Sequence, residues 1–198
     1  MKNEQQTIVL ASSSRYRREL LAKILSNFAT SNPNIDESAK DLEKPSELAL
    51  RLAIEKAEAL ANEFPNALII GSDQVAQLGN QALGKPGTHE RAIEQLRLCS
   101  GQTVYFYTGL ALHNSALGVT ESFLDCVEVK FRELSETEIS NYIERESPLD
   151  CAGSFKCEGL GITLFEKIHS NDPNSLVGLP LIELNRILIK AGVNPLLL

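Results

Sequence analysis

Short apolar runs and amphipathic stretches follow one another through the first half of the chain. Thr7–Ser12 is a β-branched run that predicts a buried strand, and apolar residues at helical spacing follow over about Arg15–Leu25. A polar stretch, Ser31–Lys44, then leads to a helix expected over about Ser46–Glu63. Ala67–Gln74 predicts a further apolar strand that ends in polar residues. Strands separated by helices favour parallel pairing.

The second half of the chain adds a long hairpin to this pattern. A helix is expected over about Thr88–Gly101, followed by strands over about Thr103–Leu112 and Glu121–Phe131. Turn residues at Asn114–Gly118 join these strands, which are therefore expected to be antiparallel neighbours. Two more helices are expected, at Ser135–Arg145 with a capping-box signature and at Leu181–Ala191. The whole pattern predicts an α/β fold around a mixed sheet.

Composition indicates one compact domain over residues 1–198. The chain is 43% hydrophobic and 23% charged, which is ordinary for a soluble domain with its own core. No apolar run approaches a signal-peptide core or the ~20 residues of a membrane span, so a cytoplasmic protein without a membrane partner is expected. The four cysteines form no Cys-x-x-Cys pair and lack nearby histidines, so reduced thiols are expected rather than a zinc site.

The net charge limits the classes of partner. A net charge of -7 disfavours a general nucleic-acid binder, because affinity for phosphate backbones comes from dense Lys and Arg surfaces. An anion could still bind where cations are gathered locally, which makes the position of each Lys and Arg informative. The sequence leaves the oligomeric state open, including a homodimer.

The first expected helix carries an arginine on its apolar side. On a 3.6-residue wheel, Arg17 lies on the same stripe as Leu20, Leu21 and Ile24. Unpaired N–H groups at a helix N-terminus favour anions, so Ser12–Ser14 followed by Arg17 could form an anion-binding corner. The alternative is a serine N-cap with an arginine lying over the sheet edge, and the pattern alone favours that interpretation.

The second expected helix carries a lysine in the centre of its apolar stripe. Lys56 lies among Leu52, Ala53 and Leu60, whereas the neighbouring glutamates lie off this stripe. A lysine at such a position either extends its ammonium group to solvent along the apolar surface or pairs with an anion. The sequence does not decide between these two interpretations.

Asp73 and Lys85 follow the second apolar strand. Asp73 is expected at the end of that strand, and the carboxyl ends of strands are where open α/β sheets bind ligands. A turn aspartate with local hydrogen bonds is the alternative. Lys85 lies between Gly84 and Pro86, which is also compatible with an ordinary loop, and the chain has neither a P-loop nor a Gly-x-Gly-x-x-Gly pattern.

These cations, together with two acids, suit one kind of ligand. Arg17, Lys56 and Lys85, with Glu37 in the polar stretch and Asp73, suit a polyphosphate bound with a divalent metal. Phosphoryl chemistry needs charge neutralisation, hard oxygen ligands and an oriented water, and these residue types provide each. Each signal is weak alone, and their agreement carries the inference.

Several short motifs occur in a fixed order along the chain. They are Ala11-Ser-Ser-Ser-Arg-Tyr-Arg-Arg-Glu-Leu-Leu21, Ile35-Asp-Glu37, Arg51-Leu-Ala-Ile-Glu-Lys-Ala57, Gly71-Ser-Asp-Gln74, Gly84-Lys-Pro86, Ala152-Gly-Ser154 and Val177-Gly-Leu-Pro180. In this order they resemble the Maf (septum-formation) family of nucleotide pyrophosphatases over about residues 7–192.

The resemblance implies an α/β fold with an elongated central mixed sheet flanked by helices, in two lobes with a cleft between them. It also implies hydrolysis of a nucleoside triphosphate to the monophosphate and pyrophosphate with a divalent metal, Mg²⁺ or Mn²⁺. On the matching positions, Asp73 would be the general base and Glu37 a metal or water partner, so that both carboxylates are candidate metal ligands. The triphosphate would be bound by Ser12, Arg17, Lys56 and Lys85, the two lysines also serving catalysis.

Three positions track base preference within the family. Here they are Tyr16, Gln74 and Glu158, which resembles the 7-methyl-GTP branch; the dTTP/UTP branch would have Arg, Thr and Gln. An aromatic face attracts the positively charged methylated ring, and a carboxylate accepts hydrogen bonds from the N–H edge of guanine. The sequence departs from the family pattern at Arg15, where proline is usual, at Tyr16, where tryptophan is expected, and at Cys157 beside Glu158.

Two alternatives remain at this point. One is a pyrophosphatase for dTTP and UTP, or for a broad range of nucleotides. The other is a non-catalytic regulator of cell division that binds a nucleotide or another partner in the cleft. The charged set of Glu37, Lys56, Asp73 and Lys85 speaks against the second, since a pure binder has no need of a water-activating acid.

Overall fold

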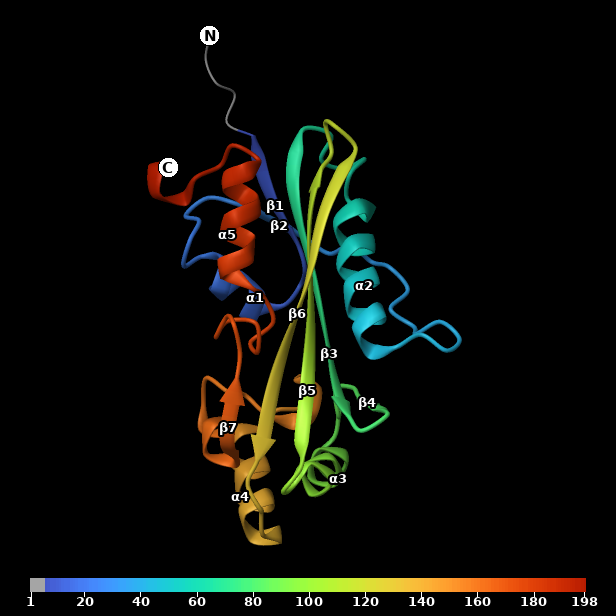
Figure 1. The fold of residues 1–198 in the computed structure, drawn as a ribbon, viewed down its shortest axis with the longest axis vertical. Coiled ribbons are helices and arrows are strands. Elements are labelled where there is room, and N and C mark those ends of the chain that lie inside the picture. Colours follow the sequence, from blue (N-terminus) through green and yellow to red (C-terminus); the bar gives the residue numbers. More distant parts are fainter. Residues whose placement is uncertain (1–5) are drawn as a thin grey trace.

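The computed structural model describes residues 6–198 and shows a mixed seven-stranded sheet with five α-helices (Figure 1). In chain order these elements are β1 (Thr7–Ala11), α1 (Arg15–Leu21), β2 (Ala29–Ser31), α2 (Pro45–Ala59), β3 (Ala67–Leu78), β4 (Gln81–Leu83), α3 (His89–Cys99), β5 (Thr103–Asn114), β6 (Val119–Phe131), α4 (Glu136–Glu146), β7 (Phe165–His169) and α5 (Leu181–Lys190). The α/β class and the mixed sheet expected from the sequence are therefore confirmed. Among the described residues, no helix is both long and apolar enough to cross a membrane.

The sheet has the strand order β2-β1-β3-β5-β6-β7, and β4 pairs with β3 outside this path. β1 pairs in parallel with both β2 and β3, because a helix-containing connection separates each pair. All the other pairs are antiparallel, including the long β5–β6 hairpin, whose strands match the two expected hairpin arms and extend beyond them. This hairpin runs along the long axis of the molecule (Figure 1).

Helices cover both faces of the sheet (Figure 1). α2 packs against one face through a cluster that includes Ala53, Ala57 and Ile69. α1 and α5 pack against the other face, where Ile70 belongs to a leucine-rich cluster. A third cluster, which includes Phe106 on β5, fills the end of the molecule where α3 and α4 lie.

The backbone of α2 approaches the sheet closely. The residues of α2 at the closest approach are small, since Ala49, Ala53 and Ala57 follow one another at four-residue spacing on one side of the helix. Opposite them lie Gly71 on β3 and Gly109 on β5, where an added Cβ would come within 2.1 Å and 2.2 Å of α2 carbonyl oxygens. Only glycine leaves room for this contact.

The structure corrects several boundaries that the sequence pattern predicted. α1 ends at Leu21 rather than near Leu25, because the chain tightens into i→i+3 hydrogen bonds from Lys23 and Ile24. α2 ends at Ala59 and not near Glu63. The sequence analysis also missed β2, β4 and β7, which are short strands without clear alternation of buried and exposed residues.

The main correction concerns β3, which continues to Leu78, so the prediction that Asp73 ends a strand is wrong. β1 pairs with β3 only as far as Gly71, and β4 pairs with it only from Ala76 onward. β5 pairs along the opposite edge through this whole region and keeps the strand extended. Residues 72–75 therefore form a free stretch of strand edge, and Asp73 lies in the middle of it.

Candidate active site

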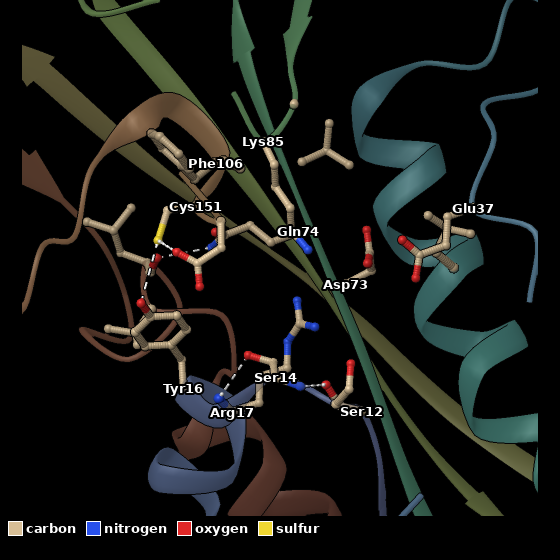
Figure 2. Close-up of a pocket in the computed structure, with 18 of the residues that line it drawn as sticks. Ser12, Ser14, Tyr16, Arg17, Glu37, Asp73, Gln74, Lys85, Phe106 and Cys151 are labelled. Carbon is tan, nitrogen blue, oxygen red and sulfur yellow. Dashed lines mark hydrogen bonds between the residues drawn. The ribbon is translucent and has the colours of Figure 1, made fainter. Parts of the chain in front are cut away.

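A cavity of about 610 Å³ opens at the free edge of β3 between β1 and β4 (Figure 2). Its wall comes from the β1–α1 turn, the loop before α2, the inner face of α2, β3, the β4–α3 loop and the segment at 150–158. Side chains alternate along β3, so Asp73 faces α2 while Gln74 faces the opposite side of the sheet. The cavity includes both residues, and it therefore reaches both faces of the sheet around this edge.

Lys56 is the centre of an ion-pair cluster in the cavity wall. Its side chain is almost completely buried, and its Nζ donates to Asp73 Oδ1 at 2.6 Å and lies 2.7 Å from Glu37 Oε1. Asp73 is also buried, whereas the Glu37 side chain is 57% exposed. Of the two interpretations of Lys56 that the sequence left open, pairing with anions is the one found in the structure.

The charges around Glu37 determine its ionisation. Burial alone would raise the pKa of Glu37, but the hydrogen bond and charge of Lys56, with the charges of Lys85 and Arg17, bring it below its usual value. Glu37 is therefore ionised at neutral pH and can bind a cation.

Arg17 points into the cavity from α1, as its position on the helical wheel predicted (Figure 2). Its Nε donates to the backbone oxygen of Gly178 at 2.8 Å, while its backbone N–H donates to Ser14 Oγ, the N-cap of α1. Burial lowers the pKa of Arg17, and the charges of Asp73 and Glu37 oppose that shift. The serine cap and the cavity-facing arginine thus occur together, although the sequence analysis treated them as alternatives.

Ser12 and Lys85 complete the set of residues expected to bind phosphate. Ser12 lies just after β1, is buried, and its Oγ accepts a hydrogen bond from the backbone N–H of Ser14 at 3.1 Å. Lys85 extends into the cavity from the loop after β4 (Figure 2). Among the described residues, Lys85 makes no ion pair within 4.0 Å, so its charge is available to a ligand.

Tyr16 lies at the opposite end of the cavity from Glu37 (Figure 2). The Arg15 guanidinium lies 4.9 Å from the centre of the Tyr16 ring, and Cys151 Sγ lies 3.9 Å from its hydroxyl oxygen. Burial and the neighbouring Cys151 raise the pKa of the Tyr16 phenol, which therefore stays neutral. Arg15 covers one face of the ring, so a planar ligand would stack on the other face.

Gln74 is held by the segment between β7 and α5. Its Nε2 donates to the backbone oxygens of Ser175 and Leu176 and to Thr108 Oγ1, at 2.9–3.2 Å. These bonds occupy the amide nitrogen and leave the amide oxygen as the group that can meet a ligand.

Glu158 is exposed at the cavity wall, and its Oε2 accepts a hydrogen bond from Cys157 Sγ at 3.4 Å. Burial raises the pKa of the Cys157 thiol to about 12 and that of the Cys151 thiol to about 11. Both thiols therefore remain protonated at neutral pH, and neither acts as a nucleophile in this state.

The arrangement has two chemically different ends. One end gathers Arg17, Lys56 and Lys85 around two carboxylates, which suits a highly charged anion and an activated water. The other end combines an aromatic ring with amide and carboxylate oxygens, which suits a flat polar group. Within residues 6–198, no cluster of three or more His, Cys, Asp or Glu side chains is arranged to hold a metal.

Comparison with protein families identifies the chain. The model of a family described as "Maf-like protein" matches residues 7–191. The chain belongs to the Maf family.

Three curated relatives of this Maf protein carry the name 7-methyl-GTP pyrophosphatase. The relative from Nitrosococcus oceani is 54% identical and covers 94% of each chain. The one from Pseudomonas putida is 58% identical over 94% of this chain and 97% of its own, and the one from Alcanivorax borkumensis is 52% identical over 98% of each. Among solved structures, the Ham1 protein of Staphylococcus aureus matches with a TM-score of 0.45 and 18% identity, over 79% of this chain and 90% of its own.

The structure brings all nine expected site residues of the Maf protein into the wall of one cavity: Ser12, Tyr16, Arg17, Glu37, Lys56, Asp73, Gln74, Lys85 and Glu158. It also adds residues that the sequence analysis missed, including Phe106, Asp150, Cys151 and Lys156. Phe106 was not recognisable, because a strand aromatic usually indicates core packing. Asp150 could have been noted from its place two residues before the Ala152-Gly-Ser154 motif.

Proposed function

We propose that this protein hydrolyses 7-methyl-GTP between the α and β phosphates, giving 7-methyl-GMP and pyrophosphate. The observation that carries the proposal is the shared name of three relatives that are 52–58% identical over nearly the whole chain. The cavity supports it, because it offers cations at one end and an aromatic and acidic surface at the other.

In the proposed reaction, Asp73 accepts a proton from a water molecule as the oxygen of that water attacks the α phosphorus. The bond between that phosphorus and the bridging oxygen breaks, and pyrophosphate leaves. Arg17, Lys56 and Lys85 bind the phosphate oxygens and offset the negative charge that grows on the leaving group. Ser12 supplies a hydroxyl group to the phosphates. The burial of Asp73 and Lys56 supports these roles, since charges act more strongly away from bulk water.

A divalent metal, Mg²⁺ or Mn²⁺, fits the donor set beside this base. Glu37 and Asp73 both offer hard carboxylate oxygens, and both lie within 2.7 Å of Lys56 Nζ. Mg²⁺ is commonly held by one or two protein carboxylates together with substrate phosphates and waters, which matches a site with two carboxylates. When bound, the metal would supply charge neutralisation at the phosphates.

The base end of the cavity supports a methylated guanine. Methylation at N7 gives the ring a positive charge, which suits the open face of Tyr16. The carboxylates of Glu158 and Asp150 both line this part of the cavity, so its charge also favours a cationic ring. Glu158 can accept hydrogen bonds from the N–H edge of guanine, and the amide oxygen of Gln74 is a further acceptor.

We further propose that the chain acts as one domain over residues 1–198, with a lobe at each end of the sheet and the cavity as the cleft between them. The separate hydrophobic clusters toward the two ends support this division. We place the reaction in the cytoplasm, where nucleoside triphosphates are available and the thiols of the four cysteines would stay reduced.

Glu158→Gln is expected to lower kcat/KM for 7-methyl-GTP and GTP about 10-fold or more while changing kcat/KM for UTP less than about twofold. A carboxylate can accept hydrogen bonds from both N–H groups of the guanine edge. Glutamine can accept only one of them, because its amide nitrogen is a donor and would face the second N–H group. A donor left without an acceptor in this way costs about 1–3 kcal/mol. Steady-state pyrophosphate release measures the effect. Equal losses for all three nucleotides would mean that Glu158 does not contact the base.

Pyrophosphate release from 7-methyl-GTP, GTP, dTTP and UTP, with Mg²⁺ and with a chelator, tests the function itself. Preferential metal-dependent cleavage of 7-methyl-GTP is the expected result. Preference for dTTP and UTP would keep the reaction and overturn the base assignment. Cleavage of none of the four would overturn the enzymatic proposal and favour a nucleotide-binding regulator.

A further inference from the structure

Glu37 lies on a segment without regular structure. Residues 32–44 connect β2 to α2 without a helix or strand (Figure 1). Such segments are mobile unless side chains hold them in place. Lys56 contacts Glu37 itself, but one contact to a half-exposed carboxylate does not fix the path of the backbone on both sides of it. Another group must hold this loop against α2.

Arg51 on α2 is the main such group, and an exposed ion pair between Lys40 and Glu55 adds a weaker contact. The Nε and Nη2 of Arg51 donate to the two carboxylate oxygens of Glu43 at 2.6 Å and 2.8 Å, a two-pronged pairing that fixes relative orientation. Nη2 also donates to the backbone oxygen of Ser38 at 3.0 Å, and Nη1 donates to Glu55 Oε2 at 2.8 Å. Arg51 thus contacts the residue directly after Glu37 and the far end of the same loop.

The Arg51–Glu43 pair is well shielded from solvent. The exposed fractions of the two side chains are 15% and 8%. The hydrogen bonds from Arg51, followed by that from the backbone N–H of Lys40, lower the pKa of Glu43 to about 2. Glu43 therefore stays ionised, and the pair has a geometry that exposed surface ion pairs seldom maintain.

Arg51 and Lys56 lie five positions apart on one helix, about 7.5 Å along its axis. The helix that presents Lys56 to the cavity therefore also sets the position of the loop that carries Glu37. We propose that Arg51 is a positioning residue of the active site, acting through Glu37 and resting on the pyrophosphatase function proposed above. It holds the loop so that the Glu37 carboxylate meets Lys56, Asp73 and the substrate in one arrangement.

This role depends on the guanidinium fork and not only on charge. Lysine has a single ammonium centre and cannot donate to Glu43, Glu55 and Ser38 in the same directions. Arg51→Lys and Arg51→Gln are both expected to lower kcat for 7-methyl-GTP by about 10-fold or more, since a small misplacement of a catalytic group is costly. KM should change less than about threefold, because the phosphate-binding cations remain. The Mg²⁺ concentration for half-maximal rate should rise in both variants.

A double-mutant cycle distinguishes positioning from a general loss of structure. If Arg51 acts through Glu37, adding Arg51→Gln to Glu37→Gln lowers kcat by less than about twofold beyond the loss in the single Glu37→Gln variant. If the two losses multiply, Arg51 does not act through Glu37 and the inference is overturned. Glu43→Gln breaks the same pairing from the loop side and repeats the test should Arg51→Gln fail to fold.

Arg186→Gln is the matched control. Arg186 also pairs with two glutamates, Glu183 and Glu121, but on α5 and β6 and outside the cavity wall. The Arg186→Gln variant should keep the wild-type kcat and Mg²⁺ dependence. A fall in kcat equal to that of Arg51→Gln would overturn the inference. If the wild type and this control release no pyrophosphate from 7-methyl-GTP, the proposed function itself fails; if both are active and the cycle is multiplicative, only the role of Arg51 fails.

Discussion

Asp73→Asn should lower kcat for pyrophosphate release by about 10²–10⁴-fold, the usual contribution of a general base. Asparagine has nearly the shape of aspartate, and its amide oxygen can still accept the hydrogen bond from Lys56. Lys56 also keeps Glu37 as an anionic partner, so its buried charge is not left alone. In the proposed reaction, the variant loses the group that takes the proton from water while retaining its neighbours.

Single-turnover and steady-state assays with 7-methyl-GTP measure this loss, and thermal unfolding reports whether the fold is kept. Asp41→Asn, at an exposed position of the loop before α2, is the control and should match the wild type in both measurements. A folded Asp73→Asn variant with nearly normal turnover would remove Asp73 from the mechanism.

Gly71→Ala is expected to have the largest effect on stability. The added methyl group would come 2.1 Å from the carbonyl oxygen of Ala53 and 2.8 Å from the backbone nitrogen of Ala57. Both atoms belong to the backbone of α2, so relief requires the helix to move away from the sheet. Such overpacking typically costs about 1–3 kcal/mol and sometimes more, and backbone contacts place this case at the upper end. Lys56 would move with α2, so activity should fall as well.

Urea unfolding of Gly71→Ala and Gly84→Ala side by side tests this prediction. An added Cβ at Gly84 meets no atom within 4 Å, so that variant should change the free energy of unfolding by less than about 0.5 kcal/mol. Equal unfolding midpoints for the two variants would show that α2 does not lie as close to β3 as described.

Periodicity in the sequence was enough to predict the inward direction of two cations. Arg17 and Lys56 share helix stripes with apolar residues, and a helix that packs on a sheet must turn that stripe toward it. Both side chains therefore point toward the sheet. Their partners were not predictable in the same way, because Lys56 meets Asp73 and Glu37 through tertiary contacts.

The position of Asp73 within its strand shows where local pattern fails. The apolar run stops at Gly71, and the polar residues that follow suggest the end of a strand. Pairing with β5 along the other edge keeps the chain extended to Leu78. Polar side chains are tolerated there because they face a cavity and the segment before α5, and sequence spacing contains no information on either. The role of Arg51 was hidden for the same reason, since nothing in the pattern shows how residues 32–44 fold back on α2.

The position of Lys56 between two carboxylates also bears on how far the fold depends on divalent ions. In many small metalloproteins the free energy of metal binding is part of the free energy of folding, so the protein unfolds when the metal is withdrawn. Here an ammonium group of the chain itself offsets part of the negative charge of Glu37 and Asp73. On the mechanism proposed above, a chelator should therefore stop turnover while the protein stays folded.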